Sequence, residues 1–192
     1  MRRSLQVITA AATFVAVSAV AYAAVELWPR KDRGGVSAPT VTASPGSTSR
    51  YSGLPLPRFV SLKTSKVNVR RGPSRQHPIA WAFTRRGLPV EITHETEHWR
   101  LVRDSEGDEG WIYHGLLSGK RTALVAPWAG EELLDLQRQP SRRSTVVARL
   151  QSGVLAEVEG CDGSWCQIEA GGRTGWVGQG DLWGVYPGEE LR

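Results

Sequence analysis

The amino-acid sequence contains one segment twice, and this repeat constrains the fold more than any other feature. Residues 90–117 and residues 156–182 both read as an alternating apolar segment, a polar break, a Trp, a second alternating segment, a Gly-Trp pair and a closing Leu. The equivalent residues Trp99 and Trp165 are 66 positions apart. Because solenoid repeats are shorter and more numerous, two copies of this length indicate a tandem pair of small domains.

Within each copy the apolar residues alternate with polar ones, which is the spacing of β-strands. In the first copy Val67 and Val69 alternate with polar residues, and Ile79, Trp81 and Phe83 do so next. The first copy nowhere holds the i, i+3, i+4, i+7 spacing of an amphipathic helix, and the second repeats its plan. Short strands separated by frequent turns predict an all-β fold, a small barrel or sandwich in each copy.

The patterns divide the chain into five parts. We predict β-units over residues 58–121 and 122–188, with a C-terminal tail at 189–192. Only a residue or two separates the units, so we expect them to contact one another. Residues 26–57 are rich in Gly, Ser, Thr and Pro and have little apolar surface to bury, which predicts a disordered linker.

Residues 1–25 are predicted to be a signal peptide or a signal anchor. Two Arg residues precede an apolar run, and Ala21-Tyr22-Ala23 fits the small-x-small rule for signal-peptidase cleavage. The uncharged run over residues 7–25 also reaches the lower end of what spans a bilayer, so anchoring in the inner membrane is the alternative to cleavage. In both cases the rest of the chain is delivered out of the cytoplasm, to the periplasm or beyond.

The charge of the chain argues against nucleic acid as a partner. The formal net charge is +5, and it falls to +3 if the segment through Ala23 is removed with its two Arg residues. The remaining charges of both signs are intermixed. The sequence has no basic stripe with interleaved aromatic residues of the kind that follows a phosphate backbone.

One motif resembles a zinc-protease sequence, but its context favours a hairpin. His94 to His98 reads HETEH, and the zinc site requires both His on one face of a helix. Ile92 before the motif and Trp99 after it belong to predicted strands, and the aligned residues 160–164, GCDGS, form a turn without the His ligands of the motif. We therefore expect a solvated hairpin tip. We expect no metal site, no cofactor and no catalytic residue, and a protein that is not an enzyme.

Cys161 and Cys166 flank a four-residue connection, residues 162–165, and are predicted to form a disulfide. In such a hairpin the two Cys face each other with Cα atoms about 5.5 Å apart. The closed loop is short, so the bond contributes about 2 kcal/mol. The repeat aligns this pair with Glu95 and Arg100. We expect an exposed ion pair there, worth about 0 to 1 kcal/mol.

The eight Trp residues fall into groups with different expected roles. Four recur at equivalent strand positions and are expected to be buried or half-buried: Trp99, Trp111, Trp165 and Trp176. Four other aromatic residues are candidates either for a ligand-binding face or for the contact between the units, and the sequence leaves both alternatives open. They are Tyr113, Trp128, Trp183 and Tyr186.

The repeated motifs resemble the bacterial SH3-like domain. VNVRRGPS at 67–74 and the Gly-Trp strands at 110–119 and 175–184 carry the resemblance, and residues 58–192 are similar to exported alphaproteobacterial proteins with two tandem SH3-like units. The resemblance implies two partly open barrels of five or six strands. The second copy departs from the pattern at residues 135–140, which read DLQRQP.

The resemblance implies that the chain is a binding or targeting module of the cell envelope. Some relatives bind peptidoglycan or peptides and many have no assigned ligand, and small aromatic-lined grooves suit extended peptides. We therefore expect a non-enzymatic module that recognises peptidoglycan or a peptide-containing ligand. The alternative is a periplasmic scaffold that binds a protein partner and has no cell-wall ligand.

Overall fold

The computed structural model describes residues 46–192. The predicted signal or anchor, residues 1–25, lies outside the described residues, as does the linker up to residue 45. None of the helical segments within 46–192 has the length and apolar character needed to cross a membrane.

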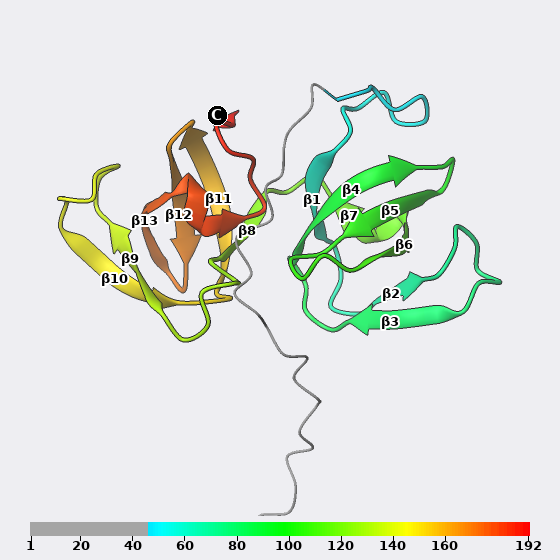
Figure 1. Cartoon of the computed structure of the whole chain (residues 1–192), viewed down its shortest axis with the longest axis horizontal. Helices are drawn as coiled ribbons and strands as arrows, with labels where there is room; N and C mark the ends of the chain where they lie inside the picture. The colour runs from blue at the N-terminus through cyan, green and yellow to red at the C-terminus, as the bar shows by residue number, and fades with distance from the viewer. Residues whose placement is uncertain (1–45) are drawn as a thin grey trace, which may run out of the picture. The chain divides into compact units, whose positions relative to one another are not determined.

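The first repeat forms a seven-stranded antiparallel sheet in the order β3-β2-β6-β5-β4-β1-β7 (Figure 1). A short 3-10 helix, η1 (His114–Leu116), precedes its last strand. The strands are β1 (Arg58–Leu62), β2 (Val67–Arg70), β3 (Ile79–Phe83), β4 (Pro89–Glu95), β5 (Trp99–Arg103), β6 (Glu109–Tyr113) and β7 (Leu117–Ser118).

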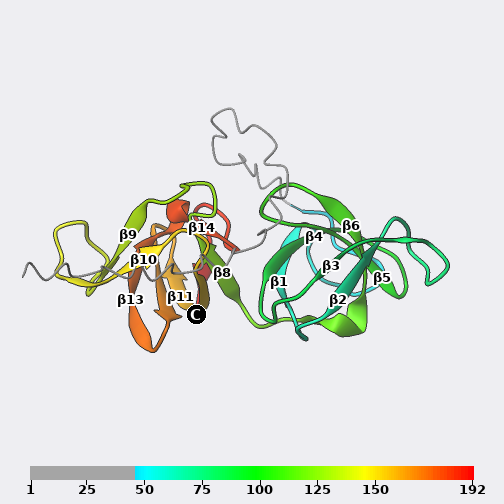
Figure 2. The same ribbon diagram turned by 90° about the horizontal axis from the view of Figure 1, so that it is seen from below.

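The second repeat forms a sheet in the order β10-β9-β13-β12-β11-β8-β14, and β15 pairs with β11 off this path. The segments are β8 (Thr122–Val125), β9 (Leu133–Gln137), β10 (Val146–Gln151), β11 (Leu155–Asp162), β12 (Trp165–Ala170), β13 (Arg173–Gly178), η2 (Gln179–Asp181), β14 (Leu182–Trp183) and β15 (Glu190–Leu191). Each strand of the first sheet has a counterpart at the same place in the second. Figures 1 and 2 show that each sheet curls on itself. The predicted all-β fold with two tandem units is confirmed.

The repeated Gly-Trp pair has a steric cause. Gly110 lies where β6 passes β2, and a Cβ atom built on it would lie 2.3 Å from Val69 Cγ1. Gly175 occupies the equivalent place in the second sheet, where a Cβ atom would lie 2.7 Å from both Leu136 Cγ and the Gln137 carbonyl oxygen. Only glycine allows the two strands to approach this closely.

The alternating residues divide between a buried and an outer face, as the sequence predicts. In β2, Val67 and Val69 are fully buried in the first core. The side chains between them therefore project to the other face of the strand. The four recurring Trp residues are half-buried, which confirms the expectation for them.

The two repeats contact each other through a cluster of aromatic and aliphatic side chains. Phe59 of β1 and Trp183 of β14 are both buried, and their rings lie 5.1 Å apart at 83°. Tyr186 packs on Phe59 at 4.7 Å, and its hydroxyl donates a hydrogen bond to Glu91 Oε1 at 2.9 Å. The expected contact between the units is thus present.

Candidate functional site

A groove of about 230 Å³ lies on the outer surface of the first repeat. It is formed by β2, the β2–β3 loop, the facing ends of β5 and β6, and η1. Its lining residues are Lys66, Asn68, Arg70, Arg75, Trp99, Tyr113 and Leu116.

Strand alternation places the first side chains of the groove. Because Val67 and Val69 point into the core, Lys66, Asn68 and Arg70 project together from the opposite face of the same segment. Their side chains are half-buried or exposed. β2 and the residue before it therefore supply two cations and an amide to one side of the groove.

The loop between β2 and β3 is held next to this strand by polar contacts. Arg70 Nη1 donates to the His77 carbonyl oxygen at 2.6 Å, and the Arg71 N–H donates to the Pro78 carbonyl oxygen at 3.1 Å. Within the loop, Ser74 Oγ lies 2.8 Å from His77 Nδ1. These contacts fix the loop that carries Arg75 into the groove.

Two aromatic rings form the other wall. Trp99 and Tyr113 lie opposite each other in the register of β5 and β6, and their rings are 5.8 Å apart at 76°. The Trp99 N–H donates to Thr96 Oγ1 at 3.2 Å, which fixes the start of β5. His114 extends the aromatic surface, since its ring lies 4.7 Å from that of Tyr113.

The HETEH motif lies on a β-hairpin. His94 and Glu95 belong to β4, whereas Glu97 and His98 lie in the turn before β5. His94 and His98 are exposed, as expected for a solvated tip, but Glu95 is buried. Within residues 46–192, no group of three or more His, Cys, Asp or Glu side chains is placed to hold a metal ion.

The expected ion pair of Glu95 with Arg100 is present, but the expectation that it is exposed was wrong. Arg100 Nε lies 3.0 Å from Glu95 Oε1, and the Glu95 side chain has no exposed surface. Arg58 and the Ser49 hydroxyl also bond to this carboxylate. Burial alone would raise the pKa of Glu95, but hydrogen bonds from Ser49, Ser52 and Arg58, with the charge of Arg58, hold the pKa below its usual value.

The residues around Glu95 show how the expected linker ends. Thr48 and Pro55 form an isolated β-bridge, and Ser49 is buried against the hairpin. Residues 46–57, which the composition assigns to the disordered linker, therefore pack on the first repeat. The Ser49 hydroxyl, which bonds to Glu95, and the partly buried Leu56, which packs against the first core, hold them there.

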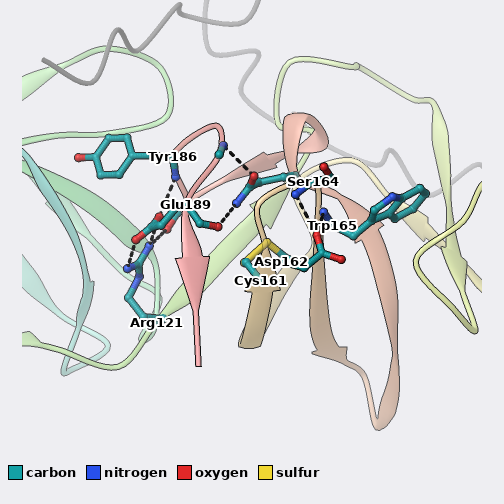
Figure 3. The surroundings of a disulfide bond; sticks show 11 residues. Arg121, Cys161, Asp162, Ser164, Trp165, Tyr186 and Glu189 are labelled. Carbon is teal, nitrogen blue, oxygen red and sulfur yellow. Dashed lines mark hydrogen bonds and ion pairs between the residues drawn. A yellow bond between two sulfur atoms is a disulfide. The ribbon is translucent and has the colours of Figure 1, made fainter.

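The second repeat contains the predicted disulfide between Cys161 and Cys166 (Figure 3). The two residues are paired directly across β11 and β12, and their Cα atoms are 4.1 Å apart, closer than the expected spacing. At the tip, Asp162 Oδ1 accepts hydrogen bonds from the N–H groups of Ser164 at 2.9 Å and Trp165 at 2.8 Å. These bonds lower the pKa of Asp162.

The C-terminal segment is held close to this disulfide. Leu191 pairs with Cys161 in the register of β15 and β11. Glu189 forms an ion pair with Arg121 at 2.7 Å, and its carboxylate accepts the Tyr186 N–H at 2.9 Å (Figure 3). These contacts position the Tyr186 ring against the first repeat, so this region contributes to the contact between repeats.

The structure separates the four aromatic residues proposed as ligand-binding. Tyr113 lines the groove. Trp183 is buried in the contact between repeats, and Tyr186 is half-buried there. Trp128 is half-buried against both that cluster and the second core. A ligand-binding role stays a prediction for all four, and only Tyr113 lies in the groove.

The sequence analysis missed the cations of the groove. Lys66 and Arg70 flank buried Val67 and Val69, so strand alternation alone indicates that they share an outer face. Arg75 lies in a loop, and its position carries no periodic signal. The sequence analysis expected Trp99 to be a buried or half-buried packing residue. Its half-buried ring packs on Tyr113 and also lines the groove.

Comparison with known proteins identifies relatives of both repeats. The family model described as bacterial SH3 domain matches residues 63–119 and 131–184. No curated protein matches the chain.

Two solved structures from Trichomonas vaginalis are similar at low identity. NlpC1 is 16% identical with a TM-score of 0.31, over 72% of this chain and 51% of that chain. NlpC2 is 14% identical with a TM-score of 0.30, over 66% of this chain and 48% of that chain. The chain therefore spans about half the length of each.

Proposed function

The chain belongs to the bacterial SH3 domain family, and we propose that it is a non-enzymatic binding module of the cell envelope. Its ligand is peptidoglycan or another peptide-containing molecule. The groove on the first repeat is the binding site. The observation that carries the proposal is the gathering of two aromatic rings and three cations along one small hollow.

The shape and lining of the groove suit one segment of an extended ligand. Ligand sites combine apolar walls with a few polar groups that fix orientation. Here Trp99 and Tyr113 offer ring surface at low cost in side-chain entropy, and Asn68 offers both a donor and an acceptor. A peptide backbone needs this combination of flat apolar contact and hydrogen bonding.

The disulfide supports a location outside the cytoplasm. Disulfides persist in oxidising compartments and are rare in reducing ones. The bond between Cys161 and Cys166 fits export through the predicted N-terminal signal or anchor. We place the protein in the periplasm, cleaved or anchored in the inner membrane, and a fractionation of cells with antibody detection tests this placement.

A sedimentation assay with purified peptidoglycan sacculi tests the function. At low salt we expect the full chain to sediment with the sacculi and the Tyr113→Ala variant to remain largely in the supernatant. Tyr51→Ala is the matched control, because Tyr51 is 43% exposed and lies away from the groove. If the parent chain stays in the supernatant, the cell-wall ligand is wrong.

The buried contact between the repeats favours a second candidate function. Phe59 and Trp183 enclose apolar surface that a pair of independent modules would not need. A scaffold whose second repeat supports the first for binding a protein partner would have this property. It predicts that one periplasmic protein co-purifies with the full chain and that sacculi do not compete with it.

A further inference from the structure

The groove of the first repeat carries an uncompensated positive charge. None of its lining residues is acidic. Within residues 46–192, Lys66, Arg70 and Arg75 form no ion pair, whereas other Arg residues of the same repeat are paired with carboxylates. The paired residues are Arg58, Arg100 and Arg103.

The three cations lie around a hollow instead of along a line. Arg70 lies on the outer face of β2 and Lys66 directly precedes that strand, whereas Arg75 comes from the loop that the Arg70 guanidinium holds in place. Arg70 uses Nη1 for this contact, so its other N–H groups remain as donors. Three positive groups at one small site favour a single anionic group of a ligand over an extended polyanion.

The aromatic wall limits what can carry that anion. Trp99 and Tyr113 are half-buried and set edge to face, so they present apolar surface next to the cations. A volume of about 230 Å³ accommodates one end or one side chain of a ligand. An anion attached to an apolar or peptide segment fits both parts of the groove.

We propose that this groove binds a peptide through a free carboxylate. Lys66, Arg70 and Arg75 hold the carboxylate, and Trp99 and Tyr113 pack on the adjoining residue. The proposal rests on the proposed function, since it names the chemical group that the binding module recognises. A carboxylate is the anion that peptides themselves carry, at the C-terminus or on acidic side chains.

The second repeat lacks this site, so the proposal assigns binding to the first repeat alone. Arg70 pairs with Trp111 across β2 and β6, and Gln137 pairs with Trp176 across β9 and β13. Gln137 therefore occupies the place of Arg70, and it is buried.

The neighbouring positions have changed as well. Two residues earlier, Asp135 replaces the amide of Asn68 with a negative charge. In the first repeat Tyr113 lies opposite Trp99 in the sheet. In the second repeat Gly178 lies opposite the equivalent Trp165, so no second ring is present there. Leu133 stands at the place of Lys66. The second repeat therefore lacks two of the three cations and one ring, and it has a carboxylate that the first repeat lacks there.

Two variants at equivalent positions test the assignment in the full chain. Arg75 and Arg142 both follow a Pro-Ser pair and are 67 residues apart. Both are exposed, so their substitution should leave the fold intact. We expect Arg75→Gln to weaken binding about tenfold, the loss of one charged hydrogen bond, while Arg75→Lys retains most of the affinity. Arg142→Gln is expected to bind as the parent does.

Two probes separate the carboxylate proposal from the proposed function. The first is sacculi whose free carboxyl groups have been converted to amides, compared with untreated sacculi. The second is acetyl-Ala-Ala-Ala with a free C-terminal carboxylate, compared with its C-terminal amide, followed by the indole N–H resonance of Trp99. We expect blocked sacculi and the amide peptide to bind at least about tenfold more weakly.

The outcomes distinguish the two ideas. If the parent binds untreated and blocked sacculi equally, the carboxylate proposal is overturned while the cell-wall function stands. If the parent does not bind sacculi but the acid peptide shifts Trp99 and the amide does not, the cell-wall ligand is wrong and the carboxylate site stands. Equal response to both peptides, or to neither, overturns the carboxylate site.

Discussion

Glu95 lies directly opposite Arg100 across β4 and β5, with Arg100 Nε 3.0 Å from Glu95 Oε1. At the equivalent place in the second repeat, Cys161 is joined to Cys166 across β11 and β12. The same hairpin is therefore closed by an ion pair in one repeat and by a covalent bond in the other. The two closures should respond differently to mutation, acid and reductant.

The Glu95→Gln variant should destabilise the first repeat strongly. Glu95 is fully buried and bonded to Arg58 and Arg100, whose side chains are only 17% and 9% exposed. Removing the carboxylate charge leaves two nearly buried cations without a charged partner, which typically costs about 3 kcal/mol or more. Urea-induced unfolding of the full chain measures the change in the free energy of unfolding.

The control for this variant lies on the same hairpin. Glu97 is 79% exposed at the tip, and its contact is with an exposed His98. Glu97→Gln should therefore change the free energy of unfolding by less than about 0.5 kcal/mol. Equal effects of the two substitutions would show that the buried position of Glu95 does not matter to stability.

Acid should remove the contribution of Glu95. Its pKa is lower in the folded protein than the ordinary value of 4.5, so the unfolded chain binds more protons in this range. The stabilisation is complete above that ordinary value and is lost as the pH falls through the lowered pKa. Thermal unfolding from about pH 6 to about pH 3 should show a smaller acid-dependent fall for Glu95→Gln than for the parent.

The pairing of Glu95 with Arg100 was predictable from the sequence, but its burial was not. The repeat aligns the two residues with the two Cys, and strand pairing then places them face to face. The groups that cover Glu95 are Ser49, 46 residues away, and Arg58, 37 residues away. Ser49 belongs to a segment whose composition predicts disorder, and Arg58 directly follows that segment. No periodicity in the sequence indicates contacts over such a separation.

The groove was predictable only in part, because part of it depends on how a loop folds. Alternation in β2 places Lys66 and Arg70 on the outer face, and the sequence shows this directly. Their convergence with Arg75 depends on how the β2–β3 loop folds back on Arg70. The sequence analysis named Tyr113 as a candidate, and the structure shows that the equivalent position of the second repeat is Gly178, which has no ring.

Reduction of the disulfide should weaken the second repeat moderately. The bond closes a loop of only a few residues, so opening it costs about 2 kcal/mol, or about 4 to 8 °C in the unfolding temperature for a chain of this size. Differential scanning calorimetry with and without dithiothreitol measures the shift. In the Cys161→Ala/Cys166→Ala variant the reductant should cause no shift, and a shift there would point to another target.

The contact between the repeats should make them unfold together. Trp183 is 4% exposed and packs edge to face on Phe59, so Trp183→Ala removes a large buried ring at the contact. Such truncations typically cost about 3 to 5 kcal/mol. We expect calorimetry to show one transition for the parent and two separated transitions for this variant.

A control variant tests whether truncating any large apolar side chain would separate the two transitions. Leu133 is a large apolar residue of the second repeat, but it is 55% exposed, so Leu133→Ala should leave the single transition in place. A milder variant, Tyr186→Phe, removes the hydrogen bond to buried Glu91 and should cost about 1 to 2 kcal/mol. If Trp183→Ala keeps one transition at the parental temperature, the Trp183 ring is not what couples the repeats, and this prediction is wrong.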